Sequence, residues 1–186
     1  MLASLELKHK TSDLARLYRL LEERIDQYLT LQDDCFHEPA LAQDCHDVKA
    51  SRSVQKTIFR AMREREMKAL RTKISEKNQT IHQAYSFIGN TPSDAILFEN
   101  LIAENFLSTY QLIWDYTRRV NYLDEYKEQK HTCEGQFAFC LVELLNLMEN
   151  ELINNRNARL GNYFITERYL GIISHHHQDL RAAITA

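Results

Sequence analysis

The sequence has little glycine and little proline, four and two residues among 186. Tight turns and β-hairpins depend on these residues, so the composition argues against a fold rich in strands. The chain also lacks an apolar run as long as the about 20 residues that a membrane-spanning helix needs. Its first residues lack the apolar centre of a signal peptide. We therefore expect an all-α protein that is cytoplasmic and has no membrane partner.

The cysteines do not resemble a disulfide framework. There are four of them, and without an export signal they indicate thiols in a reducing cytoplasm. Cys35, His37, Cys45 and His46 lie in one stretch and are zinc-binding residue types, but their spacing matches no familiar zinc motif. The adjacent Cys45 and His46 would have difficulty reaching one tetrahedral ion. We expect a loop with incidental Cys and His, and we predict no metal and no other cofactor.

The most apolar stretch of the chain is 137–148, in which only Glu143 and Asn146 are polar. Because it is apolar nearly all the way round, it predicts a helix surrounded by other helices, running from about 132 to 160. Glu143 is either a buried carboxylate with a raised pKa, as catalytic acids are, or a Glu that reaches the surface or pairs with an Arg.

Four more helices are predicted from apolar residues that recur at steps of three and four. Thr11 or Ser12 is expected to cap the first, and Thr91 followed by Pro92 and Asp94 is a strong start signal for the third. Short connections favour antiparallel neighbours. The predicted fold is one domain, residues 1–186, an elongated up-and-down bundle of about five helices with two long ones. The four additional helices span about 12–32, 47–88, 92–127 and 163–184.

The apolar face of the helix predicted over 47–88 is not constant along its length. Val54, Ile58, Ala61 and Met62 fall on one side, and the apolar residues from Met67 onward fall on another. The change occurs within the polar run 63–66. We expect one continuous helix whose two halves pack on different neighbours.

Lys and Arg are concentrated between residues 49 and 77, where ten of them accompany three acidic residues. This stretch carries a formal charge of +7, so the rest of the chain carries −10. A basic helix face can neutralise phosphates of nucleic acid or bind an acidic protein. It can also be a solvated face that balances acidic neighbours such as Asp33 and Asp34. The candidate macromolecule-binding residues are Lys49, Arg52, Lys56, Arg60 and Arg63.

Three consecutive histidines near the C-terminus suggest a metal cluster at first sight. Helical geometry spreads His175, His176 and His177 about 100° apart, so they cannot all bind one ion. His175 and Asp179 form the one i, i+4 chelating pair, and two more ligands would have to come from elsewhere. No metal site is predicted here.

Arg168, followed by six residues and then His175, fits an Arg-x(4–6)-His pattern. This pattern resembles the motif of HEPN-type helical ribonucleases, whose bundles of four to five helices dimerise to form an RNA-cutting cleft. The resemblance implies that Arg168 and His175 act on RNA phosphate and ribose, with Asp179 on the same polar side. The alternative is an ion-pairing Arg and a surface His.

The sequence favours a non-enzymatic interaction or regulatory protein, because it shows no complete catalytic set. Its expected partner is another protein or a second copy of itself in a homodimer. The first alternative is a HEPN-like, metal-independent ribonuclease using Arg168 and His175. The second is a nucleic-acid-binding regulator that uses the basic face over 49–63.

Overall fold

The computed structural model describes residues 2–34, 46–89, 91–117 and 133–157. These residues form helices and no strand, so the all-α prediction is confirmed for this part of the chain. The elements, in chain order, are α1 (Leu2–Asp34), α2 (His46–Ser86), α3 (Pro92–Thr117) and α5 (Cys133–Asn157).

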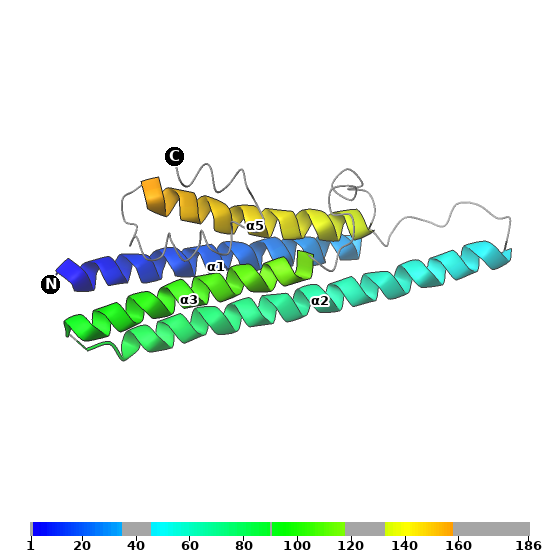
Figure 1. Ribbon diagram of the computed structural model, residues 1–186. Coiled ribbons are helices and arrows are strands. Elements are labelled where there is room, and N and C mark those ends of the chain that lie inside the picture. The colour runs from blue at the N-terminus through cyan, green and yellow to red at the C-terminus, as the bar shows by residue number, and fades with distance from the viewer. Residues whose placement is uncertain (1, 35–45, 90, 118–132, 158–186) are drawn as a thin grey trace.

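The helices lie side by side, and consecutive ones run in opposite directions (Figure 1). α1 packs on α2 and α5, and α3 packs on the same two helices from the other side of the bundle. Ion pairs tie the elements together at their surfaces. Arg71 of α2 binds Asp26 of α1 with 2.6 Å between Nε and Oδ1, and Lys10 of α1 binds Glu99 of α3 with 2.6 Å between Nζ and Oε1.

The stretch 137–148 lies in the core, as its composition predicted. Its outer side is less buried than expected, because Asn146 is exposed and Glu143 is only half-buried. Glu143 Oε2 lies 3.9 Å from Nη1 of Arg24 in α1. The interpretation of Glu143 as a surface carboxylate paired with an Arg therefore fits the structure. The buried residues of this stretch are Phe137, Ala138, Cys140, Leu141, Leu144, Leu145 and Met148.

Helix α1 begins at Leu2, about ten residues before the predicted start. The expected cap at Thr11 or Ser12 is therefore wrong, since both residues lie inside the helix and Thr11 is buried. The sequence before them contains no Gly or Pro and several good helix formers, so nothing stops the helix there. Thr and Ser mark a helix start only where the preceding residues cannot extend the helix.

The start signal of α3 is confirmed. The Thr91 hydroxyl oxygen accepts a hydrogen bond from the Asp94 backbone N–H at 3.2 Å and donates to the Asp94 carboxylate at 2.5 Å. Gly89 fits close to this cap, because a Cβ atom on it would lie 2.6 Å from Asp94 Oδ2. The predicted continuation of this helix from 118 to 127, and the predicted fifth helix over 163–184, lie outside the described residues.

A buried polar cluster crosses the middle of the bundle. The Tyr18 hydroxyl of α1 donates to Asn105 Oδ1 of α3 and lies 3.0 Å from Thr109 Oγ1. Asn105 Nδ2 in turn donates to the backbone carbonyl of Lys77 in α2 at 3.2 Å. Burial raises the pKa of Tyr18, so its hydroxyl stays protonated as a donor. Three helices are thus held in one register by a single amide.

Candidate interaction surface on α2

The N-terminal part of α2 extends past the described ends of the other helices (Figure 1). The Asp26–Arg71 pair sets the register of α1 and α2, so Asp34, the last residue of α1, comes level with about residue 63 of α2. We call residues 46–62 the arm and residues 63–86 the body of α2. At 1.5 Å per residue the arm is roughly 25 Å long.

The arm carries large apolar side chains that are exposed to solvent. A globular protein normally buries most such side chains, and several on consecutive turns of one element mark an interaction surface. The sequence analysis placed Val54, Ile58 and Met62, but not Phe59, on one side of this helix, and the neighbour expected there is absent among the described residues. Their exposed fractions are 58% for Val54, 54% for Ile58, 49% for Phe59 and 51% for Met62.

The junction between arm and body is anchored to the core. The guanidinium of Arg63 lies 4.6 Å from the ring centroid of Phe137 in α5, and Phe137 makes an edge contact with Tyr28 of α1 at 6.1 Å. Arg63 Nη1 also donates to Glu66 at 2.8 Å. The predicted binding residue Arg63 therefore takes part in packing at the base of the arm.

Along one side of α2, the residue types differ between the arm and the body. Eighteen residues make about five full turns, so residues 18 apart occupy the same position around a helix. Residues buried in the body correspond to basic residues in the arm at this separation. The helical positions that are apolar and buried in the body are therefore occupied by basic residue types in the arm. The pairs are Lys49 with Met67, Arg52 with Leu70, and Lys56 with Ile74.

The other predicted basic residues belong to the arm. Lys49, Arg52 and Lys56 are part of the α2 backbone, but their side chains lie outside the described residues. Arg60 is half-buried. Between residues 48 and 63 the sequence contains no acidic residue. By helical position, the basic residues of the arm fall on a different side of α2 from Val54 and Ile58.

The remaining predicted site residues fall where the structure does not describe them. This holds for Arg168, His175 and Asp179, for Cys35, His37 and Cys45, and for the side chain of His46. Within the described ranges, no group of three or more His, Cys, Asp or Glu residues is placed to hold a metal ion. Cys140 is a buried thiol whose pKa burial raises to about 12, so it remains protonated and unreactive at neutral pH.

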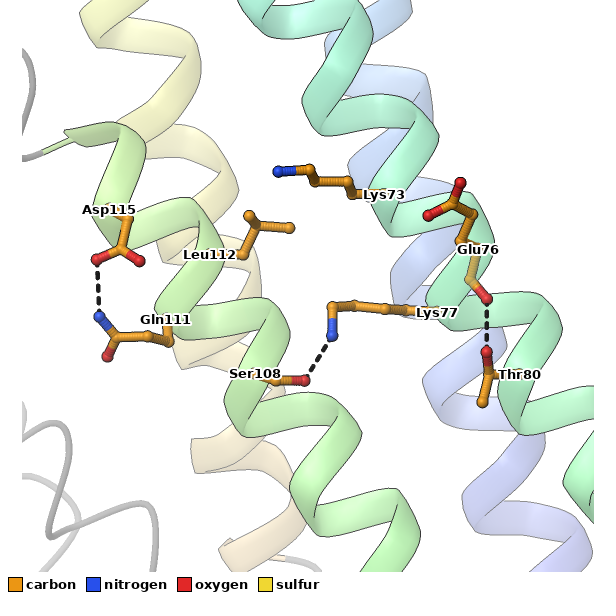
Figure 2. A pocket seen from close by; sticks show the side chains of 8 residues that line it. All are labelled: Lys73, Glu76, Lys77, Thr80, Ser108, Gln111, Leu112 and Asp115. Atoms are coloured by element: carbon orange, nitrogen blue, oxygen red, sulfur yellow. Dashed lines mark hydrogen bonds between the residues drawn. The ribbon is translucent and has the colours of Figure 1, made fainter.

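A groove of about 460 Å³ lies on the surface between the body of α2 and α3 (Figure 2). Lys77 Nζ crosses it to donate to Ser108 Oγ at 2.6 Å, and partial burial lowers the Lys77 pKa. Lys73 lines the same groove together with the carboxylates of Glu76 and Asp115. Charges of both signs therefore balance within it. Ser108 Oγ accepts from Lys77 and donates to the backbone carbonyl of Asn105.

Comparison with models of protein families, with curated proteins and with solved structures finds no match in any of the three. None of the helices in the described part of the chain combines the length and the apolar character needed to cross a membrane. The arm is the candidate site that stands out in the geometry. Its exposure was the feature that sequence reasoning missed, although the change of apolar face at 63–66 was a signal for it.

Proposed function

We propose that this chain is a cytoplasmic, non-enzymatic interaction or regulatory protein that binds another macromolecule through the arm of α2. The observation that carries the proposal is the exposure of Val54, Ile58, Phe59 and Met62, each about half open to solvent on neighbouring turns. An amphipathic helix face of this kind is a common docking element for another helix.

The attachment of the arm also supports binding. Arg63 on the Phe137 ring and the Arg63–Glu66 ion pair hold the base of the arm against the bundle. The arm therefore does not have to be ordered from a random chain when a partner arrives, and association costs less conformational entropy. A partner meets a helix that is already formed along its length.

The proposal includes a homodimer formed at the opposite end of the molecule. Phe87, Ile96 and Leu97, near the α2–α3 turn, are 86%, 62% and 68% exposed. From residue 78 to residue 117 the sequence contains no Lys or Arg, and Lys10 of α1, which lies at this end, is paired with Glu99. The bundle of each copy is proposed to include the predicted fifth helix over 163–184. Sedimentation of the chain against a Phe87→Ser/Leu97→Ser variant tests this part, and a monomer at all concentrations contradicts it.

A photo-crosslinking pair tests the arm itself. A benzoylphenylalanine at Phe59 places the crosslinker in the arm, and the same group at Phe87 provides a control that is more exposed but lies at the other end of α2. In an extract of the native cells, we expect a protein adduct from the Phe59 position that Ile58→Ser/Met62→Ser removes. The Phe87 position should yield only the homodimer.

Two outcomes would contradict the proposal. One is a Phe59 position that yields no adduct above the background seen without irradiation. The other is an adduct that survives Ile58→Ser/Met62→Ser unchanged, because contact with the arm would then not depend on its apolar residues. Circular dichroism of each variant checks that α2 stays helical.

A further inference from the structure

We infer that a groove between α1 and the body of α2 binds a small ligand that carries a chain of phosphate groups. The groove lies where the two helices run side by side (Figure 1) and has a volume of about 460 Å³, which is within the range of small-molecule sites. Its lining comes from residues 8–19 of α1 and 78–85 of α2. This site is separate from the arm and does not depend on the proposed function.

The register of the two helices brings the lining residues into two facing lines. α1 and α2 run in opposite directions, and the Asp26–Arg71 ion pair fixes their alignment. The small Ala15 side chain lies in the middle of its line and is buried, so it leaves open the space that a larger residue would fill. Counted from the ion pair, the facing residues are Arg19 with Asn78, Ala15 with His82, and Ser12 with Tyr85.

Arg19 supplies a positive charge at the centre of the groove. Its Nε atom donates to the backbone carbonyl of Ala15 at 3.4 Å, so the guanidinium is folded back along α1 toward the position that faces His82. Among the described residues, Arg19 forms no ion pair with a carboxylate. Its terminal amino groups can therefore donate to two oxygens of one phosphate group, the geometry that a guanidinium favours.

The groove contains donors but no carboxylate. Every lining side chain except that of Ala15 carries a polar group, and none is acidic. Lys8, Ser12 and His82 are exposed there and add an ammonium, a hydroxyl and an imidazole donor. By contrast, the groove between α2 and α3 contains both Glu76 and Asp115. The α1–α2 groove therefore has the composition of an anion site.

The acidic residue nearest to Arg19 on this side of α1 is engaged elsewhere. Glu22, one turn further along, lies beside Arg71 of α2. The hydrogen bond to Asp26 and, less strongly, the charge of Glu22 raise the pKa of Arg71. On α2, the sequence contains no Asp or Glu from residue 77 to residue 93. The positive charge of Arg19 is thus left to a ligand.

The spacing of the donors selects a ligand with several phosphate groups. Lys8 and Arg19 lie eleven residues apart on one side of α1, which is about 16 Å along the helix. A single phosphate placed on Arg19 cannot reach the region of Lys8, whereas a chain of phosphates follows the groove from one toward the other. Each phosphate can then meet a donor from at least one of the two helices.

Asn78 gives a second, independent indication of a ligand. Its side chain lines the groove, and its Oδ1 atom is shielded from water and accepts no hydrogen bond within the described part of the chain. A buried acceptor without a donor destabilises the folded state. Rotation of the amide toward the groove would bring its NH2 group to a phosphate oxygen or its oxygen to a ligand hydroxyl.

Isothermal titration calorimetry with the full chain tests the site. The probes are inorganic tripolyphosphate and ATP, both without divalent cations, and inorganic phosphate is the control ligand. We expect at least one triphosphate to bind with a Kd below about 1 mM, at least about tenfold more tightly than inorganic phosphate, and more weakly as salt rises. Equal binding of both probes assigns recognition to the phosphate chain alone, and binding of ATP only adds contacts to the nucleoside.

Variants locate the binding in the groove. Arg19→Gln should weaken the triphosphate at least about tenfold, and Ser12→Glu should do the same by placing a carboxylate among the donors. The matched control is Arg24→Gln, which removes the same charge from α1 beside Glu143 and should change the affinity by less than about twofold. Circular dichroism checks that each variant keeps its helix content.

Other results would overturn the inference. It fails if neither triphosphate binds, or if Arg24→Gln weakens binding as much as Arg19→Gln, because attraction to the helix would then be unspecific. Loss of binding in Arg52→Gln/Lys56→Gln, with Arg19→Gln unaffected, would assign the triphosphate to the arm. Tighter binding of a 20-nucleotide RNA that depends on Arg19 would assign the groove to nucleic acid. None of these results bears on the crosslink expected from Phe59, so the proposed function stands or falls separately.

Discussion

The two halves of α2 have the same backbone but opposite surroundings. In the body, Met67, Leu70, Ile74 and Ile81 are fully buried among the neighbouring helices. In the arm, the residues one 18-residue interval earlier are basic at three of these positions, and the large apolar residues lie on another side and are exposed. The comparison shows that helix formation and burial are separate outcomes of a sequence.

The physical reason lies in what each property requires. A helix continues through any stretch without Gly or Pro whose residues tolerate helical backbone, and His46–Ser86 contains neither. Burial requires apolar residues on one constant line, and that line changes from apolar to basic at Arg63. Among the described residues, the packing of the bundle therefore ends near residue 63 while α2 continues, and the arm is the consequence.

The largest expected effect comes from the same substitution made in both halves. Ile74→Ala should lower the free energy of unfolding by about 2–5 kcal/mol, because it leaves a cavity at a fully buried position. Ile58→Ala should change it by no more than about 0.5 kcal/mol, because the side chain is already half-exposed. Urea denaturation followed by circular dichroism measures both.

These two variants test whether the body is buried and the arm is exposed. A cost above about 2 kcal/mol for Ile58→Ala would mean that the arm is packed in the folded chain, and it would remove the basis for a docking surface. A small cost for Ile74→Ala would mean that the body is not the cooperative core. Retained helix content in both variants is the control for local unfolding.

Much of the fold could be predicted from the sequence because its signals are local. The periodicity over 47–88 and the Thr91 cap depend on residues within one or two turns, and both are present in the structure. The start of α1 was missed because Thr11 and Ser12 have the residue types of a cap, and only the absence of a helix breaker before them argues otherwise. At this position the cap-type residues predicted a helix start, whereas the absence of a helix breaker predicted a continuous helix.

The candidate site was predicted only in part because exposure is not a local property. Composition marked the basic residues of 49–63 as candidates, and helical periodicity predicted Val54 and Ile58 on another face. Whether a neighbour covers that face depends on where α1 ends relative to α2, and the Asp26–Arg71 register that fixes this position joins residues 45 apart in sequence. The role of Arg63 in the junction depends equally on Phe137, far along the chain.

A smaller effect is expected from the buried polar cluster that joins the body of α2 to α1 and α3. Asn105→Ala removes the acceptor of the Tyr18 hydroxyl and the donor to the Lys77 carbonyl, so it should cost about 1–3 kcal/mol. Tyr18→Phe should cost less, because Asn105 keeps its bond to Lys77. A double-mutant cycle measured by urea denaturation should give a coupling of at least about 0.5 kcal/mol, and additivity within error would show that the two side chains do not act together.

The smallest expected change in stability concerns Arg63, at the junction between the arm and the body. Arg63→Ala removes a guanidinium from the Phe137 ring and an ion pair with Glu66, both partly shielded from water. We expect a loss of about 1 kcal/mol. Lys68→Ala is the control, because it removes an i, i+4 pair with Glu64 at an exposed site and should change stability by about 0.5 kcal/mol or less.

The more informative measurement on Arg63→Ala is amide hydrogen exchange. If the Arg63–Phe137 contact holds the arm to the bundle, its loss should speed exchange in residues 50–62 severalfold and leave 70–81 unchanged. Lys68→Ala should leave both segments unchanged. Equal acceleration in arm and body would show that Arg63 contributes only to global stability. The arm would then be held by helix propagation alone.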